Sequence, residues 1–421
     1  FYGILASNER DHPFMDEGFN SFYEDRYMAT RYPGGSPSLE IDIAGLDLGT
    51  DNINESELLY LLSKRRGKDA SLWHTHSTGY DGETYGTLVY KRTAVELKYL
   101  EAYLGTAAFD AMMQSYYETW KFKHPQPADM REAMQSTAKG KNISWWFDQR
   151  LASAGKVDYR LGRIRTTGEN KYDIPVKLRG QSVPFVLAAL NDTGGIIRQE
   201  WYEPLDKSTR ISWQLDQPVH SFAIDAKERM PLYRRGLSQA QVGKALPHMP
   251  EFKGVIGLVT RQNRVFVLPS MGFNQNDGYM LGLGLMSPLV LPQDFEYAVL
   301  PMWAFGSDQL VGQGFMRYNI HPETGAFRRI QLGTSIQHYD NFSPIAGSNA
   351  APAIRLTTAA RLRDALSSPR TRAFNLSAAS VPWVRPLGLL LPAFTTQNLL
   401  LLSAAYGEEY RNLRNPWSWR M

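Results

Sequence analysis

The chain of 421 residues contains no cysteine, which excludes disulfide bonds, a thiol nucleophile and a cysteine-ligated metal. It also lacks an uninterrupted apolar run of about 18 residues, the length that a transmembrane helix needs. No histidine is followed by a glutamate, so the zinc-binding motif His-Glu-x-x-His is absent from the sequence as well. Any chemistry must therefore rest on carboxylates, histidines outside that motif, hydroxyl groups or basic side chains.

Charge of one sign is also missing, because 46 basic and 42 acidic residues leave a net charge of +4. This balance is too small to suggest a nucleic acid partner by itself. Apolar residues make up 43% and charged residues 21%, as in ordinary globular proteins, and the length suits two or three domains. Aromatic residues are plentiful at 12%, which is compatible with carbohydrate binding, a membrane interface or large β cores.

Residues 1–150 have a mainly helical pattern, and the segment 12–23 stands out. Phe19, Phe22 and Tyr23 recur at i, i+3 and i+4, which predicts a helix with one face in the core. Glu17 falls in the first turn of that helix, where the helix dipole favours a negative charge. On the pattern alone, Glu17 is explained as a helix-terminal charge without any function.

The same stretch resembles part of a known zinc site. Phe1-Tyr2-Gly3 followed by Met15-Asp16-Glu17-Gly18-Phe19 is similar to the second half of the site in alanyl-aminopeptidase-type gluzincins. In that family a His-Glu-x-x-His helix supplies two ligands and the general base, and a second helix supplies a glutamate as third ligand. The resemblance implies that Glu17 is this zinc ligand and that the missing motif would end just before Phe1. We therefore expect a fragment that binds zinc weakly and is inactive alone.

The chemistry of zinc explains the expected combination of ligands. A catalytic zinc ion takes three protein ligands, often two histidines and one glutamate, and keeps a fourth position for water. The metal lowers the pKa of this water, which then attacks a peptide carbonyl. The resemblance thus implies a peptide substrate and one zinc ion as cofactor.

A tyrosine is the second candidate residue. Tyr90 lies on the apolar stripe of a helix predicted over 85–104, and on the pattern alone it is a packing residue. Its surroundings, Val89-Tyr90-Lys91-Arg92-Thr93-Ala94, resemble the family's Tyr-Glu-Lys-Gly-Ala helix, although Arg92-Thr93 replaces the usual Lys-Gly. The resemblance implies that Tyr90 donates a hydrogen bond to the oxyanion that forms at the scissile carbonyl. A phenol suits this role because it is neutral at pH 7.

Three histidines are weighed as further candidates. His12 and Asp16 lie close to Glu17 in the sequence and are predicted to orient it as hydrogen-bonding partners. His74 and His76 alternate as in a strand, so both imidazoles could share one face and hold a metal; a solvated loop is the alternative. We place no zinc there.

Near residue 155 the hydrophobic period changes from helical to alternating. Tyr172, Ile174 and Val176 alternate with polar neighbours, and turn signals separate several such short runs. This pattern predicts an immunoglobulin-like β sandwich over 151–235, with 226–235 as an exit strand and linker. It resembles the β domain that follows the catalytic domain in many of these peptidases.

Residues 250–421 are predicted to form a further antiparallel β region with about six to eight strands. The strands are longer, and each has one apolar face and one polar or small face, as in 279–286 and 330–337. This is the pattern of an outer-membrane barrel, and the region resembles the surface-antigen type of barrel. A soluble β domain is the alternative. A barrel would place the protein in a bacterial cell envelope, in the periplasm or outer membrane.

Two classes of function follow from these patterns and resemblances. The first is a fragment of a zinc-dependent metallopeptidase of the aminopeptidase type, with a multidomain fold of thermolysin-like helical part, β sandwich and β region. The second is a non-enzymatic envelope β protein for transport or adhesion, with a vestigial peptidase domain. A carbohydrate-binding protein is a third class, suggested only by the aromatic residues. The choice between exopeptidase and endopeptidase is open, because the residues that hold a substrate's free amine in this family lie upstream of the matching stretch.

Overall fold

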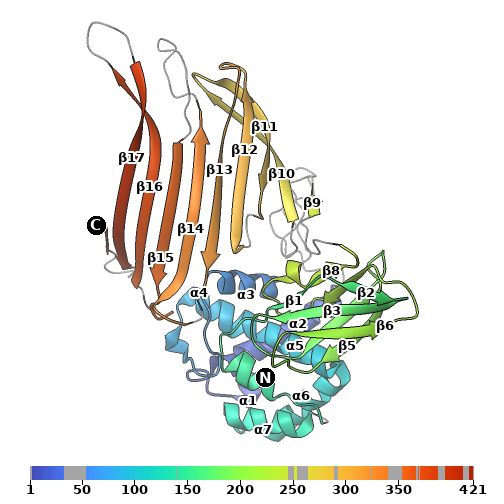
Figure 1. Ribbon diagram of the computed structural model, residues 1–421. Helices are drawn as coiled ribbons and strands as arrows, with labels where there is room; N and C mark the ends of the chain where they lie inside the picture. Colours follow the sequence, from blue (N-terminus) through green and yellow to red (C-terminus); the bar gives the residue numbers. More distant parts are fainter. Residues whose placement is uncertain are drawn as a thin grey trace.

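The structure is a computed structural model that describes residues 2–32, 54–138, 140–244, 251–253, 264–288, 293–322, 324–339, 353–366, 368, 370–386, 394–410 and 417–420. A helical region and a small β sandwich form the base of the molecule, and a large β sheet rises from them (Figure 1). The predicted fold class, helices followed by antiparallel sheets in a multidomain chain, is confirmed. Phe1, used in the family resemblance, lies outside the described residues. None of the described helices is long and apolar enough to span a bilayer.

The first 151 residues form the helical region. Its elements are α1 (Tyr2–Leu5), η1 (Pro13–Met15), α2 (Glu17–Arg31), α3 (Glu55–Arg65), η2 (Ser77–Gly79), α4 (Gly82–Thr84), η3 (Tyr85–Arg92), α5 (Thr93–Leu104), α6 (Thr106–Trp120), α7 (Pro127–Thr137) and η4 (Trp146–Leu151). The predicted helix over 85–104 is present, but its first half, η3, is a π-helix. Gly105, with φ of +85°, ends α5 because only glycine adopts this conformation without strain.

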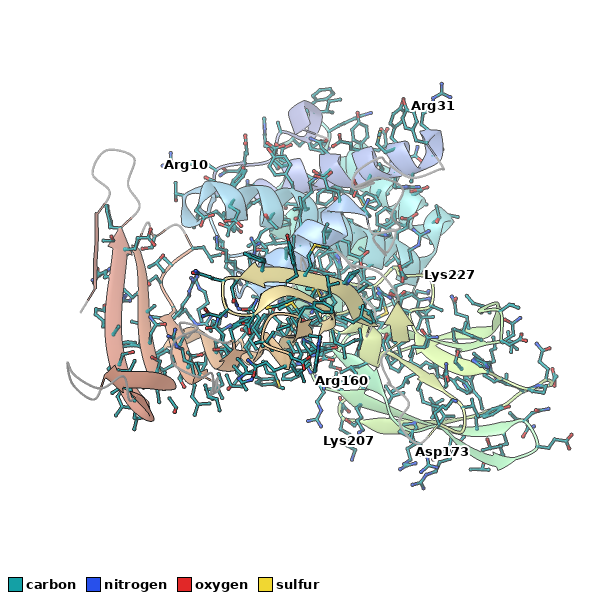
Figure 2. The ribbon with its side chains drawn as sticks, turned by 90° about the horizontal axis from the view of Figure 1, so that it is seen from above. Arg10, Arg31, Arg160, Asp173, Lys207 and Lys227 are labelled. Carbon is teal, nitrogen blue, oxygen red and sulfur yellow. The ribbon has the colours of Figure 1, made fainter. Side chains whose placement is uncertain are left out.

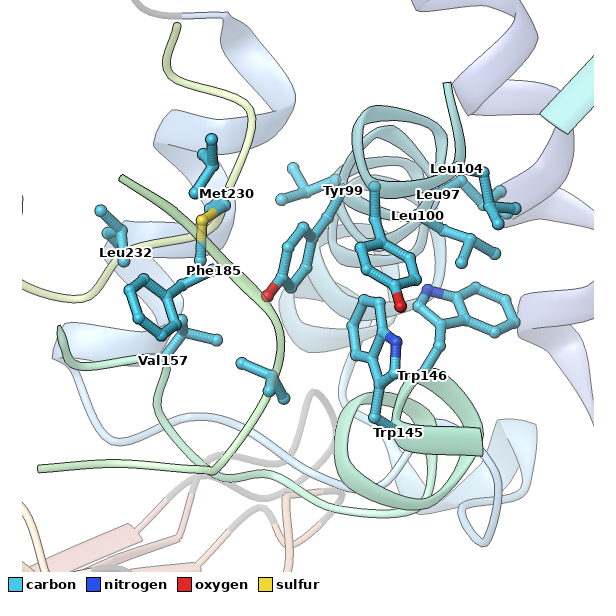
Figure 3. Packing of buried hydrophobic residues seen from close by; sticks show 14 of the residues in the cluster. Leu97, Tyr99, Leu100, Leu104, Trp145, Trp146, Val157, Phe185, Met230 and Leu232 are labelled. Carbon is cyan, nitrogen blue, oxygen red and sulfur yellow. The ribbon is translucent and has the colours of Figure 1, made fainter. Parts of the chain in front are cut away.

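One hydrophobic core joins the helical region to the sandwich. It extends from Leu5 to Ala240 and includes Tyr99 and Trp146 of the helical region with Phe185 of the sandwich. Figure 3 shows Tyr99 between the tryptophans of the helical region and Phe185. The Tyr99 hydroxyl donates a hydrogen bond to the Pro184 carbonyl, so the phenol is satisfied although it is fully buried. The base of the molecule is therefore held by a shared core.

The predicted β sandwich consists of two four-stranded sheets. One contains β1 (Tyr159–Leu161), β2 (Arg165–Gly168), β3 (Lys171–Leu178) and β6 (Thr209–Gln214); the other contains β4 (Phe185–Leu190), β5 (Ile196–Tyr202), β7 (Ser221–Ile224) and β8 (Gln239–Gln241). The alternation along β3 places one face of the strand in the core, as predicted, and Tyr172, Ile174 and Val176 are buried there. The strand predicted over 226–235 is wrong. Arg235 there pairs with the buried Asp225 at 2.9 Å, and Asp225 accepts backbone hydrogen bonds that shape a turn instead.

In the described parts of 251–420 the large sheet has ten strands, more than the predicted six to eight. They are β9 (Glu251–Lys253), β10 (Arg264–Asn274), β11 (Gly278–Met286), β12 (Phe295–Ala304), β13 (Gln309–Ile320), β14 (Phe327–His338), β15 (Ala353–Leu362), β16 (Arg370–Pro386), β17 (Phe394–Tyr410) and β18 (Trp417–Arg420). They pair in chain order, and every pair except the parallel β9–β10 is antiparallel. Over the described residues the edge strands β9 and β18 do not pair, so the sheet is open.

The two faces of this sheet differ in chemistry. Residues opposite one another in an antiparallel pair share a face, so the register assigns each side chain. We call one face the apolar face; it exposes Leu281, Leu283, Leu285, Trp303, Leu310, Tyr318, Leu332, Ile336, Leu356, Leu376 and Leu402. We call the other the polar face; it carries Gln313, Arg317, Asn319, Gln331, Ser335, Arg355, Thr357, Arg361, Asn375, Ser377 and Ser403. The alternation predicted from the sequence is therefore present.

Polar contacts join the base of the large sheet to the rest of the molecule. Arg65 of α3 donates to the Gln293 side chain and to the Tyr233 carbonyl, both at 2.8 Å. Arg234 forms an ion pair with Asp294 just before β12. In the view from above, Asp173 and Lys207 mark the sandwich at one end of the molecule, and the C-terminal strands of the large sheet lie at the other (Figure 2). The sheet is thus anchored by polar and charged groups, with Leu366, after β15, packed against the core of the base.

Candidate functional site

Glu17 lies at the first position of α2, held there by the turn before it. Pro13 begins the short helix η1, and Phe14 and Met15 are buried, which fixes the direction of the chain into α2. Gly18 allows α2 to approach η3 and α5 closely. A Cβ atom on Gly18 would lie 2.3 Å from the Thr93 Cβ and 2.7 Å from the Val89 carbonyl oxygen. The glycine therefore places the half-buried Glu17 side chain against the helix that carries Tyr90.

Tyr90 lies on the π-helix η3, between the buried residues Leu88–Val89 and α5. Its phenol lies close enough to the Glu17 carboxylate to interact with it electrostatically, so the two predicted site residues are brought together. Burial, and next the interaction with the Glu17 carboxylate, hold the pKa of the Tyr90 phenol well above its ordinary value. The phenol is therefore a neutral donor at physiological pH. Its ring packs edge-on against Tyr85, with centroids 6.0 Å apart, which limits its rotation.

Asp16 and His12 lie close to Glu17, but among the described residues neither side chain forms a hydrogen bond with its carboxylate. The Asp16 carboxyl is buried, and burial, followed by the neighbouring charges of Glu17 and Glu9, raises its pKa to about 6. Its Oδ1 atom has no hydrogen-bond partner among the described residues, nor does the Nδ1 atom of His12. Burial also lowers the pKa of His12. Their role in orienting Glu17 stays a prediction.

The pair His74 and His76 does not lie on a strand. The chain there forms a turn that leads into η2, and His76 Nδ1 lies 3.1 Å from Asp11 Oδ1 at the surface. In the described part of the chain, no group of three histidine, aspartate or glutamate side chains is arranged to hold a metal ion.

A buried ionic network supports η3 from behind, and the sequence patterns above did not predict it. Arg92, the last residue of η3, is fully buried and pairs with Asp69 at 2.7 Å. Glu96, one turn further along α5, is also fully buried and pairs with Arg150 at 2.5 Å. In the sequence, Arg92 stands out only as a departure from the family motif. One sequence signal could have predicted this network. Arg92 is a charged residue on the apolar face of a helix, and Glu96 follows it four residues later, at the spacing of an ion pair on one helix face.

The site can supply part of a metal centre. Glu17 offers one carboxylate ligand and Tyr90 one neutral hydrogen-bond donor, which fits one ligand of zinc and one group facing the reacting carbonyl. The described residues do not complete a three-ligand set. The geometry is therefore compatible with the predicted half of a zinc site.

Comparison with known proteins shows distant structural similarity only. No model of a protein family matches the chain, and no curated protein does. The crystal structure of Legionella pneumophila aminopeptidase A in complex with aspartic acid is similar over 53% of this chain and 24% of its own, with 10% identity and a TM-score of 0.37. Trypsin-activated α2-macroglobulin from Escherichia coli is similar over 63% of this chain and 23% of its own, with 10% identity and a TM-score of 0.16. The chain thus spans about a quarter of each of these proteins, and neither similarity is close enough to assign an activity.

Proposed function

We propose that the helical region is part of the catalytic domain of a zinc-dependent metallopeptidase of the aminopeptidase type. In this proposal Glu17 is the third zinc ligand, and two histidines come from sequence preceding Phe1. The observation that carries the proposal is the close approach of α2 to η3 and α5 at Gly18, which brings the Glu17 carboxylate near the Tyr90 hydroxyl. The same family resemblance implies both residues, and they lie on different helices that Gly18 allows to approach closely.

The roles of the two residues follow from their chemistry. Bound zinc would act as a Lewis acid on the peptide carbonyl and activate a water molecule. Glu17 would hold the metal through a carboxylate at the start of α2. Tyr90 would donate its hydroxyl proton in a hydrogen bond to the carbonyl oxygen as negative charge develops there. Since η3 rests on the buried Arg92–Asp69 pair, the phenol is held in place before substrate binds.

A specific observation favours a second function, attachment to a bacterial outer membrane through the large sheet. Its apolar face exposes many leucines and aromatics, whereas soluble proteins rarely expose large continuous apolar patches. Phe374 and Tyr406 form an aromatic pair at 4.8 Å near one end of this face, followed by the ion pair of Arg370 with Glu408. An apolar band that ends in aromatic and then charged residues suits a lipid bilayer. If the peptidase site proves inactive, the second candidate function is that of a non-enzymatic envelope protein attached through this sheet.

The peptidase proposal is tested on the chain extended upstream through its two histidine ligands. We expect one equivalent of zinc and hydrolysis of aminoacyl or peptide substrates. Glu17→Gln should release zinc and abolish activity, whereas Glu24→Gln, on the same helix, should change neither. Tyr90→Phe should keep zinc and lower kcat by about 10²–10³, as removal of an oxyanion donor does in other hydrolases. Tyr27→Phe is the matched control, since Tyr27 is exposed. A folded extended chain without zinc or activity would overturn the proposal.

A further inference from the structure

Two arginines face each other on the polar face of the large sheet. Arg329 of β14 and Arg361 of β15 are partners in the antiparallel register, so their side chains leave the sheet side by side. Directly opposed residues have Cβ atoms about 4.5–5.5 Å apart, and like charges at this spacing repel each other. A negative charge between the two guanidinium groups would relieve this repulsion.

The described residues supply this compensation only in part, through the nearby carboxylate of Glu296. The Arg329 guanidinium donates to Asn319 Oδ1 at 2.8 and 3.2 Å, and an amide oxygen carries no net charge. The nearby carboxylate of Glu296 is already engaged, with Arg317 at 2.5 Å and with the Gln293 backbone N–H at 3.2 Å. Neither Arg329 nor Arg361 forms an ion pair with a carboxylate in the part of the chain that the structure describes. Both therefore keep donors for an anion.

The surroundings of the pair are also positive. His321 follows β13, and burial, then the charges of Lys156, Arg329 and Arg65, lower its pKa to about 4. The imidazole is neutral at pH 7 because it is buried and three cations surround it. Both of its ring nitrogens are buried and lack a hydrogen-bond partner among the described residues. An unsatisfied polar ring beside several cations indicates a place where an anion would be stabilised.

We propose that Arg329 and Arg361 form a binding site for an oxyanion, a phosphate group or a carboxylate, on the polar face of the sheet. Guanidinium groups present paired N–H donors that match both anions. Asn319 fixes the position of Arg329, and Gln331, whose side chain also donates to Asn319 Oδ1 at 2.8 Å, fills the adjacent row of the face. A bound oxyanion would relieve the repulsion between the two arginines. The site is independent of the Glu17–Tyr90 pair, so the peptidase proposal can fail without affecting it.

Calorimetric titration of the 421-residue chain at low ionic strength tests the site. The probes are inorganic phosphate and an N-acetylated tripeptide whose only anionic group is its terminal carboxylate. We expect Arg361→Gln to weaken binding by at least about tenfold, because half of the guanidinium pair is lost. Arg355→Gln is the matched control, since Arg355 lies on the same strand and face, six residues or about 20 Å away. It should bind like the wild type.

Thermal unfolding gives a second measurement. Phosphate should raise the melting temperature of the wild type and of Arg355→Gln, but not that of Arg361→Gln. Without an anion, Arg361→Gln should melt above the wild type, because the repulsion is removed. Binding of phosphate alone would identify a phosphate ligand, and binding of the tripeptide alone a carboxylate ligand. Absence of binding for both probes, or equal binding by all three proteins, would overturn the proposal.

Discussion

The base of the molecule and the large sheet handle apolar and charged side chains in opposite ways. The base has one continuous core that runs through helices and sandwich, and buried charges such as Glu96 and Arg150 are paired there. The large sheet buries only small apolar clusters, such as Met280 with Met302, and exposes most of its leucines on the apolar face, with Leu399 and Leu401 exposed on the other. The base thus has the interior of a water-soluble domain, whereas the sheet presents apolar surface to its surroundings.

This difference teaches that the two regions depend on different sources of stability. Burial of apolar area inside the base contributes about 25 cal/mol per Å², and it is complete without any partner. Leu356 and Leu402 on the sheet remain 57% and 75% exposed, so their contribution is not realised within the chain. Substitutions in the base should therefore act on folding in water, whereas substitutions on the apolar face should act on association with lipid if the proposed membrane attachment holds.

The strongest effect is expected for Glu96→Leu in the base. This change leaves Arg150 and Arg92 buried without their shared carboxylate, which lies 2.5 Å from the first and 3.7 Å from the second. Removal of one partner of a buried ion pair costs about 3–5 kcal/mol. Urea unfolding should show this loss as a lower free energy of unfolding of the base.

An exposed ion pair is the control for this prediction. Arg131 pairs with Asp148 at 2.6 Å, but both side chains are about a third exposed or more. Arg131→Gln should cost at most about 1 kcal/mol, because solvent screens the pair. Equal losses in the two variants would contradict the view that the base depends on its buried network.

The next effect is expected for Leu356→Arg on the apolar face. If this face contacts lipid, a guanidinium near the middle of the band costs about 2–4 kcal/mol of insertion free energy. Flotation with phospholipid vesicles should show weaker association of the variant. In water the same change should leave the unfolding free energy nearly unchanged, because Leu356 is exposed there.

Thr357→Arg separates the two faces of the sheet. Thr357 is the next residue of β15 and belongs to the polar face, where it opposes Gly333. The new charge would lie away from lipid, so vesicle association should not change. If both variants associate with vesicles equally, the apolar face does not contact lipid. The exposed leucines of the sheet would then not serve membrane attachment.

A smaller effect is expected for Gly18→Ala, which tests the packing that joins Glu17 to Tyr90. The added methyl group would overlap Thr93, and overpacking of this kind costs about 1–3 kcal/mol. The change should also separate the carboxylate from the phenol, which a shift of the Tyr90 absorbance titration toward ordinary pH would show. Gly86→Ala in η3 is the control, because no atom lies within 4 Å of the position that its methyl group would take. Unfolding curves in urea should move for the first variant only.

Much of this architecture could be predicted from local sequence patterns. The alternation in β3 and in the large sheet follows directly from residues such as Ile174 and Leu281, whose burial or exposure depends on strand geometry. The end of α5 at Gly105 follows from backbone conformation. Glu17 and Tyr90 could be identified as candidate site residues only because the residues around them resemble a family motif.

The remainder depends on contacts between segments far apart in the chain. The pair of Arg150 with Glu96 has no local signature at Arg150, and the turn at 226–235 is determined by the carboxylate of Asp225. The facing arginines at 329 and 361 depend on the strand register, which periodicity does not specify. Sequence patterns therefore predicted the elements, while long-range polar contacts determined where they meet.

The smallest effect concerns the joint between base and sheet, where His321 lies. Its pKa is about 6.5 in the unfolded chain and about 4 in the folded protein, since burial and three cations disfavour the imidazolium. Between these values the unfolded state binds more protons, so stability is full above pH 6.5 and is lost as the pH falls toward 4. After a discount for the partly exposed ring, the loss is about 1–2 kcal/mol. His321→Gln should remove this part of the pH dependence, measured as the difference in urea unfolding free energy from the wild type at about pH 7 and about pH 4.5. His220→Gln, on the exposed surface of the sandwich, should leave the pH dependence unchanged. A similar change in both variants would show that the cations at the joint do not act on His321.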